Sequence, residues 1–362
     1  MKTTPTLLAS LLMLALIGVA SPALASGWGS TATERALTMS ELIPRMSSGQ
    51  AYSERYSFAV DFDDGGHVGI NFTISNLGVR SGYGASEVRV RLPDHDNHRF
   101  AERYSRGDWS YDPDSFGLEI GPSSIKASGE DAFDFVYRGD DVEVELRFEL
   151  QMPMWRPGSG EIRSGDDYYR YTLVGPRSNV SGRIKIDGQW KDVTGTRRGY
   201  ADHVATNVAP FDLGKRFTRF RNYNDDAFIM WREIGLTEAF GGGTASWVVV
   251  GVGDRIVYQD ANADVRFGEL ERDDETGYLI PHATQVTSQQ GDDRLRFVLR
   301  GNDVNRRDLL ASYGRVGRAV ASRFSEPYEY VVAGDYTLEV LVGGRPLRLR
   351  GSSHVTVDHV NR

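Results

Sequence analysis

The sequence predicts an all-β protein with two antiparallel β-barrels in tandem and one or two short peripheral helices. Three observations lead to this fold class. Apolar and polar residues alternate in many short segments, glycine accounts for 40 of the 362 residues, and aromatic residues make up 11% of the chain. Many short strands joined by glycine-rich turns are typical of barrels and sandwiches, and the length is sufficient for two domains.

The alternation is clearest at 142–150, where every second residue is apolar and the residues between them are charged. Such a strand has one buried face and one solvated face, as in an antiparallel sheet. Two further alternating runs, 56–62 and 68–74, flank the sequence DDGG at 63–66, which predicts a hairpin turn. Similar short strands are expected at 87–92, 168–174, 180–186, 216–222, 227–233, 246–252, 255–260, 263–269, 279–287, 294–300, 328–333, 336–342, 345–350 and 353–358.

Helix signals occur in two places. Residues 33–47 are expected to form a short helix that Pro44 ends, and 303–324 is expected to form a longer one. The second segment places Leu309, Tyr313, Val316, Val320 and Phe324 on one apolar stripe, while its polar face carries five arginines. This helix would either pack on the outside of a barrel or act as a lid or membrane-surface helix.

Residues 1–25 have the layout of a secretory signal peptide. A single lysine precedes an apolar stretch at 7–20, and a small-residue sequence, ALA, follows at 23–25. We expect cleavage after Ala25; a retained anchor is the alternative, but the apolar run is short for a span of about 20 residues. The sequence therefore predicts export across the inner membrane, with the periplasm as the expected location.

After the signal peptide, we expect an N-terminal extension at 26–50, an N-terminal barrel at 51–221 and a C-terminal barrel at 222–362. The boundary falls near the sequence RNYND, which separates two strand-rich halves. The halves show no sequence repeat, so the division rests on strand count and length.

Composition excludes several classes of function. The formal net charge is −8, and cleavage after Ala25 would remove one lysine and change it to −9; an acidic chain does not favour phosphate backbones, so no nucleic-acid partner is expected. The chain has no cysteine, which rules out disulfides, thiolate metal sites and cysteine nucleophiles. An exported protein without disulfides must be held together by core packing, which fits a Gram-negative periplasm.

The sequence GYADH at 199–203 contains the candidate catalytic residues Tyr200, Asp202 and His203. On a strand Tyr200 and Asp202 share a face, whereas His203 points to the opposite one. A buried carboxylic acid with a raised pKa could protonate a carbon–carbon double bond in a dry pocket. The alternative is that these polar side chains satisfy buried backbone groups where the two barrels meet.

Aromatic and arginine residues on the predicted strands form a candidate ligand-binding set. Most will be ordinary core residues, but some would line a cavity if a barrel is hollow. Arg219 would either meet a ligand headgroup or pair with carboxylates on a surface strand. The candidate ligand-binding residues are Trp155, Phe217, Arg219, Phe220, Trp231 and Trp247.

No cofactor or metal site is predicted. The sequence PDHDNH at 93–98 contains His95 and His98 beside Asp94 and Asp96, a spacing that could bind zinc. The stretch follows a predicted strand and opens with proline, so we interpret it as a polar surface loop.

Three stretches carry a resemblance to a known group of proteins. YSFAVDFDDGGHVGINFTISNLG (56–78), VSGRIKIDGQWKDVTGTRRGYADH (180–203) with APFDLGKRFTRFRN (209–222), and the tail from 328 to 359 resemble segments of the fungal survival-factor family. The GYADH sequence also looks like an element of the wider group that holds the AttH-like proteins and the carotenoid 1,2-hydratases. The likeness covers roughly residues 50–360, and its diagnostic motifs occupy about a fifth of that length.

The resemblance implies two lipocalin-like barrels that handle a hydrophobic small molecule. Its fungal branch is associated with lipid handling and survival under oxidative stress, and other branches are hydratases and cyclases. Two departures weaken the enzymatic carry-over: VATN follows His203 where hydratases continue with polar or aromatic residues, and Arg197 with Arg198 replaces a small-residue step. We therefore expect a carrier or stress-protective protein that binds a lipid or isoprenoid, with peripheral membrane contact. The alternative is a cofactor-free hydratase, isomerase or cyclase that acts on a hydrophobic polyene such as a carotenoid.

Overall fold

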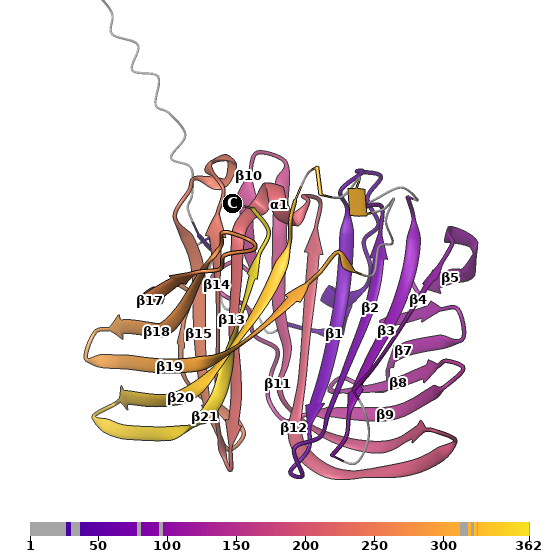
Figure 1. Ribbon diagram of the computed structural model, residues 1–362. Helices are drawn as coiled ribbons and strands as arrows, with labels where there is room; N and C mark the ends of the chain where they lie inside the picture. The colour runs from indigo at the N-terminus through magenta and orange to yellow at the C-terminus, as the bar shows by residue number, and fades with distance from the viewer. Residues whose placement is uncertain are drawn as a thin grey trace, which may run out of the picture.

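A computed structural model describes residues 27–29, 37–77, 81–93, 97–311, 318–319, 322–323 and 325–361. Within them the chain forms two antiparallel sheets that stand side by side (Figure 1). This confirms the predicted fold class of two lipocalin-like β-barrels in tandem. The predicted signal peptide at 1–25 lies outside the described residues, as do Asp94, His95 and Asp96 of the candidate metal loop.

The first sheet has twelve strands, which run in the order β4-β3-β2-β1-β12-β11-β9-β8-β7-β6-β5, with β10 paired to β11. The sheet curls into a nearly closed barrel, so that Trp109 of β5 donates a hydrogen bond of 3.0 Å to the Gly82 carbonyl beside β3. The strands are β1 (Ser53–Asp61), β2 (His67–Ser75), β3 (Tyr83–Arg91), β4 (His98–Tyr104), β5 (Trp109–Tyr111), β6 (Gly117–Ile120), β7 (Ser123–Ala127), β8 (Ala132–Arg138), β9 (Val142–Leu150), β10 (Glu161–Ser164), β11 (Asp167–Ile186) and β12 (Gln189–Thr206).

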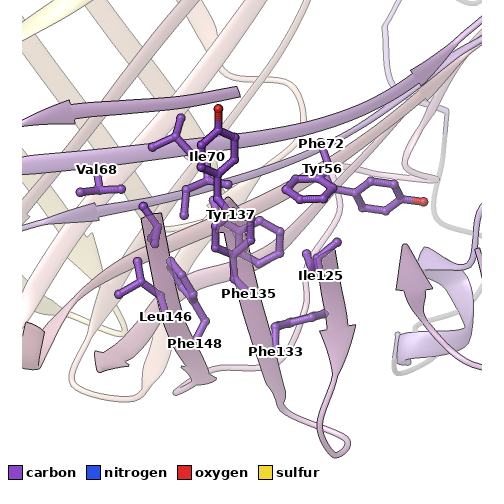
Figure 2. Packing of buried hydrophobic residues seen from close by; sticks show 14 of the residues in the cluster. Tyr56, Val68, Ile70, Phe72, Ile125, Phe133, Phe135, Tyr137, Leu146 and Phe148 are labelled. Carbon is purple, nitrogen blue, oxygen red and sulfur yellow. The ribbon is translucent and has the colours of Figure 1, made fainter. Parts of the chain in front are cut away.

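Alternation along these strands fills the first barrel with apolar side chains. Figure 2 shows Phe72 of β2 above Phe133, Phe135 and Phe148 of β8 and β9. The rings of Phe72 and Phe135 meet edge to face with their centroids 5.3 Å apart, an arrangement that aromatic pairs favour. The expected DDGG turn is confirmed, since it joins β1 to β2 with Gly65 at a φ of 87°.

The second sheet has nine strands in the order β16-β15-β14-β13-β21-β20-β19-β18-β17. Its interior is filled by aromatic residues, with Phe220 stacked on Trp231 and both rings against Phe297. The strands are β13 (Gly214–Asn224), β14 (Ala227–Leu236), β15 (Thr244–Val252), β16 (Arg255–Asp260), β17 (Asp264–Arg272), β18 (Leu279–Gln290), β19 (Asp293–Asp308), β20 (Tyr328–Val342) and β21 (Arg345–His359).

The chain passes from one sheet to the other between Thr206 and Gly214, through the short helix α1 (Pro210–Leu213). All of β13 pairs within the second sheet. The change of sheet therefore falls at 207–213, several residues before the expected division between 221 and 222.

The described helices are shorter than the sequence predicts. The segment 33–47 contains only the 3-10 turn η1 (Met39–Leu42) among its described residues; η2 (Arg106–Asp108) and η3 (Glu238–Phe240) are similar single turns. The expected helix at 303–324 is wrong at its start, because β19 continues to Asp308 and pairs residues 303–308 with β20. Pairing with a distant strand overrides the local apolar period there. In the described part of the chain, no helix has the length and apolar character needed to cross a bilayer.

The two sheets meet along a third apolar cluster, which we call the seam. Tyr169 and Tyr171 of β11 and Tyr200 of β12 pack there against Met230 of β14 and Trp247 of β15. Arg177 of β11 fastens one end of the seam. Its guanidinium is buried and donates to the carbonyls of Asp225, Asp226 and Gly253 at distances of 2.9–3.3 Å, all in hairpin turns of the second sheet.

Candidate functional site

The backbone register of β12 separates the three candidate catalytic residues. Tyr200 and Asp202 point into the seam, and the Tyr200 hydroxyl donates a hydrogen bond to Asp202 Oδ2. His203 points the other way and stacks on Tyr56 with ring centroids 4.5 Å apart. The structure thus brings Tyr200 and Asp202 together, as strand alternation predicts, and leaves His203 out.

Four polar side chains from both sheets form the centre of the seam: Tyr171, Tyr200, Asp202 and Arg232. Arg232 Nη2 donates to the Tyr200 hydroxyl over 2.8 Å and also to Asp202 Oδ2. The hydroxyls of Tyr171 and Tyr200 are 3.1 Å apart, and Tyr171 is the donor because the Tyr200 proton is already directed at Asp202. We call these four residues the polar seam cluster.

The electrostatics of the cluster fix the ionisation of Asp202, which is 2% exposed. Burial raises the pKa of Asp202, but the charges of Arg232 and Arg55 outweigh this effect and hold the pKa below its ordinary value. Asp202 is therefore a carboxylate at neutral pH. It is not the neutral acid with a raised pKa that protonation of an alkene would require.

The tyrosines keep their protons. Burial raises the pKa of Tyr200 to about 12, against the opposing charge of Arg232, and burial raises the pKa of Tyr171 well above its usual range. Both phenols are therefore hydrogen-bond donors at neutral pH. Asp202 Oδ1 is buried and has no hydrogen bond of ordinary geometry among the described residues, but Ser57, which lies opposite Asp202 in the strand register, interacts with the carboxylate and helps to lower its pKa.

A second ion pair lies against the aromatic ring of Tyr200. The Arg221 guanidinium is 4.6 Å from the centre of the Tyr200 ring and donates to Asp61 Oδ2 over 3.1 Å. The other Asp61 oxygen is 2.7 Å from His67 Nδ1. Burial raises the pKa of Asp61, but the charge of Arg221 and the contact with His67 lower it well below the usual range. Tyr200 thus contacts two arginines, Arg232 at its hydroxyl and Arg221 at its ring, and each arginine is paired with a carboxylate.

His203 belongs to a separate buried group at the end of the first barrel. Its Nε2 atom is 3.7 Å from Glu54 Oε2, which accepts a hydrogen bond of 2.8 Å from Tyr56. Glu54 also accepts a hydrogen bond of 3.1 Å from the Arg45 backbone N–H. Burial raises the pKa of Glu54, but its interaction with His203 contributes to a net lowering. This group anchors residues 42–45 over the barrel end, where the Leu42 carbonyl accepts a further hydrogen bond from Tyr56.

The structure divides the candidate ligand-binding set among three places. Trp155 and Trp247 meet edge to face in the seam with ring centroids 5.3 Å apart, and Phe217 packs against the same cluster. Phe220 and Trp231 lie instead in the core of the second barrel. Arg219 is paired with Asp358 and with Glu329, the latter at 2.8 Å, which matches the carboxylate alternative.

Sequence reasoning missed Tyr171, Arg232 and Trp28 as site residues. Trp28 packs on the rings of Tyr169 and Tyr171 at centroid distances of 6.1 and 6.2 Å. Its neighbour Gly29 is hydrogen-bonded to β10. A signal for Arg232 was present, because it is a charged residue inside the apolar run AFIMWREIGL, and such residues are seldom buried without a partner.

A hollow of about 250 Å³ adjoins the seam. Its lining is mixed, with two carboxylates beside apolar side chains; its Met152 belongs to the seam cluster, while Met154 packs against the first barrel core. No group of three or more His, Asp or Glu side chains positioned to hold a metal occurs among the residues that the structure describes. The lining residues are Leu37, Glu130, Asp131, Leu150, Gln151, Met152, Pro153 and Met154.

Comparison with known proteins identifies similar chains. No family model matches the sequence. The chain is 21% identical over 241 residues to the ceramide-binding protein SVF1 of Yarrowia lipolytica, an alignment that covers 60% of each chain, so the match spans less than two thirds of the relative.

Solved structures extend the comparison to nearly the whole chain. An AttH protein of Nitrosomonas europaea superposes with a TM-score of 0.55 at 14% identity over 91% of this chain and 98% of that one. Kievitone hydratase of Nectria haematococca gives 0.56 at 13% identity over 92% and 96%, and CghA bound to Sch210972 gives 0.61 at 10% identity over 94% and 96%. The chain therefore resembles the survival-factor, AttH-like and hydratase group, as the sequence predicts, and it has the lipocalin-like double-barrel fold of that group.

Proposed function

We propose that the protein binds a hydrophobic small molecule with an uncharged polar end, and that the seam holds this end. The observation that carries the proposal is the polar seam cluster, in which two protonated tyrosines, a buried carboxylate and a half-buried arginine lie among aromatic side chains. A few converging polar groups in apolar surroundings are characteristic of small-molecule sites.

The cluster suits a ligand that both donates and accepts hydrogen bonds. Arg232 supplies donors, and the Tyr171 oxygen can accept because its one proton points at Tyr200. Asp202 Oδ1, beside Ser57, is a further buried acceptor. A buried acceptor of this kind gains free energy when a hydroxyl or amide N–H reaches it. Ceramide has hydroxyl and amide groups at one end and long apolar chains, and the similarity to a ceramide-binding protein supports this ligand class.

Apolar groups next to the cluster could receive the chains of such a ligand. Trp247 stacks on Tyr171 and meets Trp155 edge to face, and the 250 Å³ hollow includes Met152 of the same seam. Methionine side chains adapt their shape to varied apolar partners. Aromatic residues occupy the interior of the first barrel (Figure 2) and that of the second, so the seam and the hollow are better candidates for the ligand than the barrel cores.

The second candidate function is a cofactor-free hydratase, isomerase or cyclase. It is favoured by the short hydrogen-bonded chain from Tyr171 through Tyr200 to Asp202. In such an enzyme Asp202 would act as a base or would stabilise a developing positive charge, because its pKa is lowered. Tyr200, rather than Asp202, would be the proton donor.

We also propose export to the periplasm with cleavage after Ala25, so that Trp28 lies close to the mature N-terminus. The support for this is the signal-like sequence at 1–25. Cell fractionation and N-terminal sequencing of the native protein test it. A first residue other than Ser26, or a cytoplasmic location, would contradict the proposal. A stress-protective role for the exported protein is part of the same proposal.

Extraction followed by mass spectrometry tests the binding proposal. Purified protein should carry an extractable lipid or isoprenoid, and ceramide should bind the lipid-free form. Asp202→Asn and Tyr171→Phe should weaken binding by about tenfold each, because each removes a hydrogen bond in a buried site. Tyr258→Phe is a matched control, since Tyr258 is a buried, hydrogen-bonded tyrosine in the second barrel.

The two candidate functions give different results in this test. A carrier has no turnover, so Asp202→Asn can affect only ligand binding. An enzyme instead loses conversion of a polyene in this variant, while the ligand still binds. Protein that yields no extractable lipid and binds neither ceramide nor a hydrophobic dye contradicts both.

A further inference from the structure

We propose that a small hollow on the outer face of the second barrel binds a phosphate group, independently of the seam. The hollow has a volume of about 120 Å³ and lies on β19, β20 and β21. Its lining includes three arginines but one carboxylate. The lining residues are Arg296, Val298, Thr337, Leu338, Glu339, Arg348, Leu349 and Arg350.

Strand register explains why these charges lie together. Arg296, Glu339 and Arg348 are cross-strand neighbours in one row, and Val298, Thr337 and Arg350 form the next row. Adjacent rows on the same face of an antiparallel sheet lie within reach of long side chains. The inward-facing Leu338 between them is buried in the barrel core, so the arginines stand on a rigid base.

The charges in the hollow are not balanced. Arg348 Nε is 3.5 Å from Glu339 Oε1, which leaves this carboxylate already engaged. The Arg296 and Arg350 side chains form no ion pair or hydrogen bond with the described part of the chain. Two guanidinium groups therefore remain for a ligand in a protein whose overall net charge is −8.

The row on one side of the hollow is matched. There Arg300 is 3.8 Å from Glu269, and Asp335 accepts a hydrogen bond of 2.5 Å from Ser352. The unpaired arginines of the hollow are therefore not repeated in that row.

The size and the donors of the hollow fit a phosphate group. Its volume of about 120 Å³ is far below the roughly 300–1,000 Å³ of pockets for drug-sized ligands, yet it exceeds the roughly 30 Å³ share of one water. Guanidinium groups match phosphate oxygens in a two-pronged geometry, and the Thr337 hydroxyl can donate as well. The phosphate could belong to free inorganic phosphate or to the headgroup of an anionic phospholipid.

Calorimetric titration with inorganic phosphate, and co-sedimentation with phosphatidylcholine vesicles that contain phosphatidic acid, test the proposal on the whole chain. The double variant Arg296→Gln/Arg350→Gln should bind the phosphate group about tenfold or more weakly. The control is Arg255→Gln/Arg266→Gln, which removes the same charge from exposed arginines of β16 and β17. The control should bind as the unmodified protein does.

Each outcome decides the matter. Loss of vesicle binding in the hollow variant alone identifies a lipid headgroup, while loss of inorganic phosphate binding without any vesicle binding identifies free phosphate. Absence of both kinds of binding in the unmodified protein, or an equal loss in the control, overturns the proposal. Seam variants such as Asp202→Asn should leave phosphate binding unchanged, so failure here is distinguishable from failure of the proposed function.

Discussion

At the scale of single residues, an ion pair between Asp202 and Arg232 joins the two sheets. Asp202 comes from β12 of the first sheet and Arg232 from β14 of the second, and the Asp202 side chain is 1% exposed. Desolvation of a carboxylate is costly, and its removal from water is offset here by Arg232 and by the Tyr200 hydroxyl. The pair therefore depends on both partners being present.

Removal of one partner should be more harmful than removal of both. We expect Arg232→Met to lower the free energy of unfolding by about 3 kcal/mol, because it leaves the Asp202 charge buried without compensation. The double variant Asp202→Asn/Arg232→Met should recover much of this loss. Urea unfolding of the single and double variants measures both; equal losses in the two would mean that the charge of Asp202 is compensated elsewhere.

The sequence predicts one half of this site but not the other. Alternation in GYADH places Tyr200 and Asp202 on one face and His203 on the opposite one, and the structure agrees. Alternation cannot identify which distant strand that face will meet, so Arg232 and Tyr171 were not predicted as partners. The pKa of Asp202 depends on those partners, which is why the expected raised value is replaced by a lowered one.

At the scale of elements, β11 is the strand that shapes the first barrel. It pairs with β12 along its whole length and with β9 over its second half, and its pairing with β12 shifts register four times between Leu173 and Gly182. Such bulges bend a strand and increase its twist. Local sequence predicts two short strands here, 168–174 and 180–186, because the bulged stretch between them, VGPRSN, lacks alternation.

Gly182 tests the requirement for a glycine in this bend. Its φ is 133°, and an added Cβ would lie 2.1 Å from the Glu145 carbonyl oxygen of β9. We expect Gly182→Ala to lower the free energy of unfolding by about 3 kcal/mol, since backbone strain and a clash with main chain add. The control is Gly188→Ala in the β11–β12 turn, with φ at 77° and open space around the Cβ position, where strain alone should cost about 1 kcal/mol.

Other elements show why local patterns succeed or fail. The turn at 63–66 is predicted because its acidic and glycine residues act within the turn itself. The first half of β19 is predicted as the strand 294–300, but its second half is not, because residues 303–308 take their conformation from β20, about 25 residues further along the chain. A signal for β8 was available in the sequence AFDFVYR, whose aromatic residues alternate inward.

At the scale of the whole molecule, the histidines of β21 link stability to pH. His359 is buried, stacks on Tyr278 with ring centroids 4.5 Å apart, and has its Nε2 atom 3.1 Å from the Leu279 carbonyl. Burial and the charge of Arg216 lower the pKa of His359 to about 4, from an ordinary 6.5. His354 is exposed, but partial desolvation and the charges of Arg221, Arg219 and Arg91 also lower its pKa. The folded state therefore favours the neutral form of both imidazoles.

This preference should destabilise the protein in mild acid. Below pH 6.5 His359 binds a proton in the unfolded chain but stays neutral in the folded one. The free energy of unfolding therefore keeps the full contribution of His359 above pH 6.5 and falls as the pH approaches 4. The loss from His359 should reach about 3 kcal/mol. Urea midpoints at pH 7.5 and pH 4.5 measure it, and His359→Gln should reduce the difference between the two. An unchanged difference in that variant would assign the pH dependence to other groups.

Arg177 couples the unfolding of the two barrels. Arg177 is 1% exposed, and its Nη1 and Nη2 atoms donate to three carbonyls of the opposite sheet, so separation of the sheets would leave these donors and carbonyls without partners. Melting of either half would strip the other of its partner groups, so the barrels should behave as one thermodynamic unit despite having separate cores. Scanning calorimetry should show a single endotherm whose calorimetric and van't Hoff enthalpies agree, and Arg177→Met should split it into two. Arg177 lies outside the polar seam cluster, so substitutions within that cluster should leave this link between the two sheets in place.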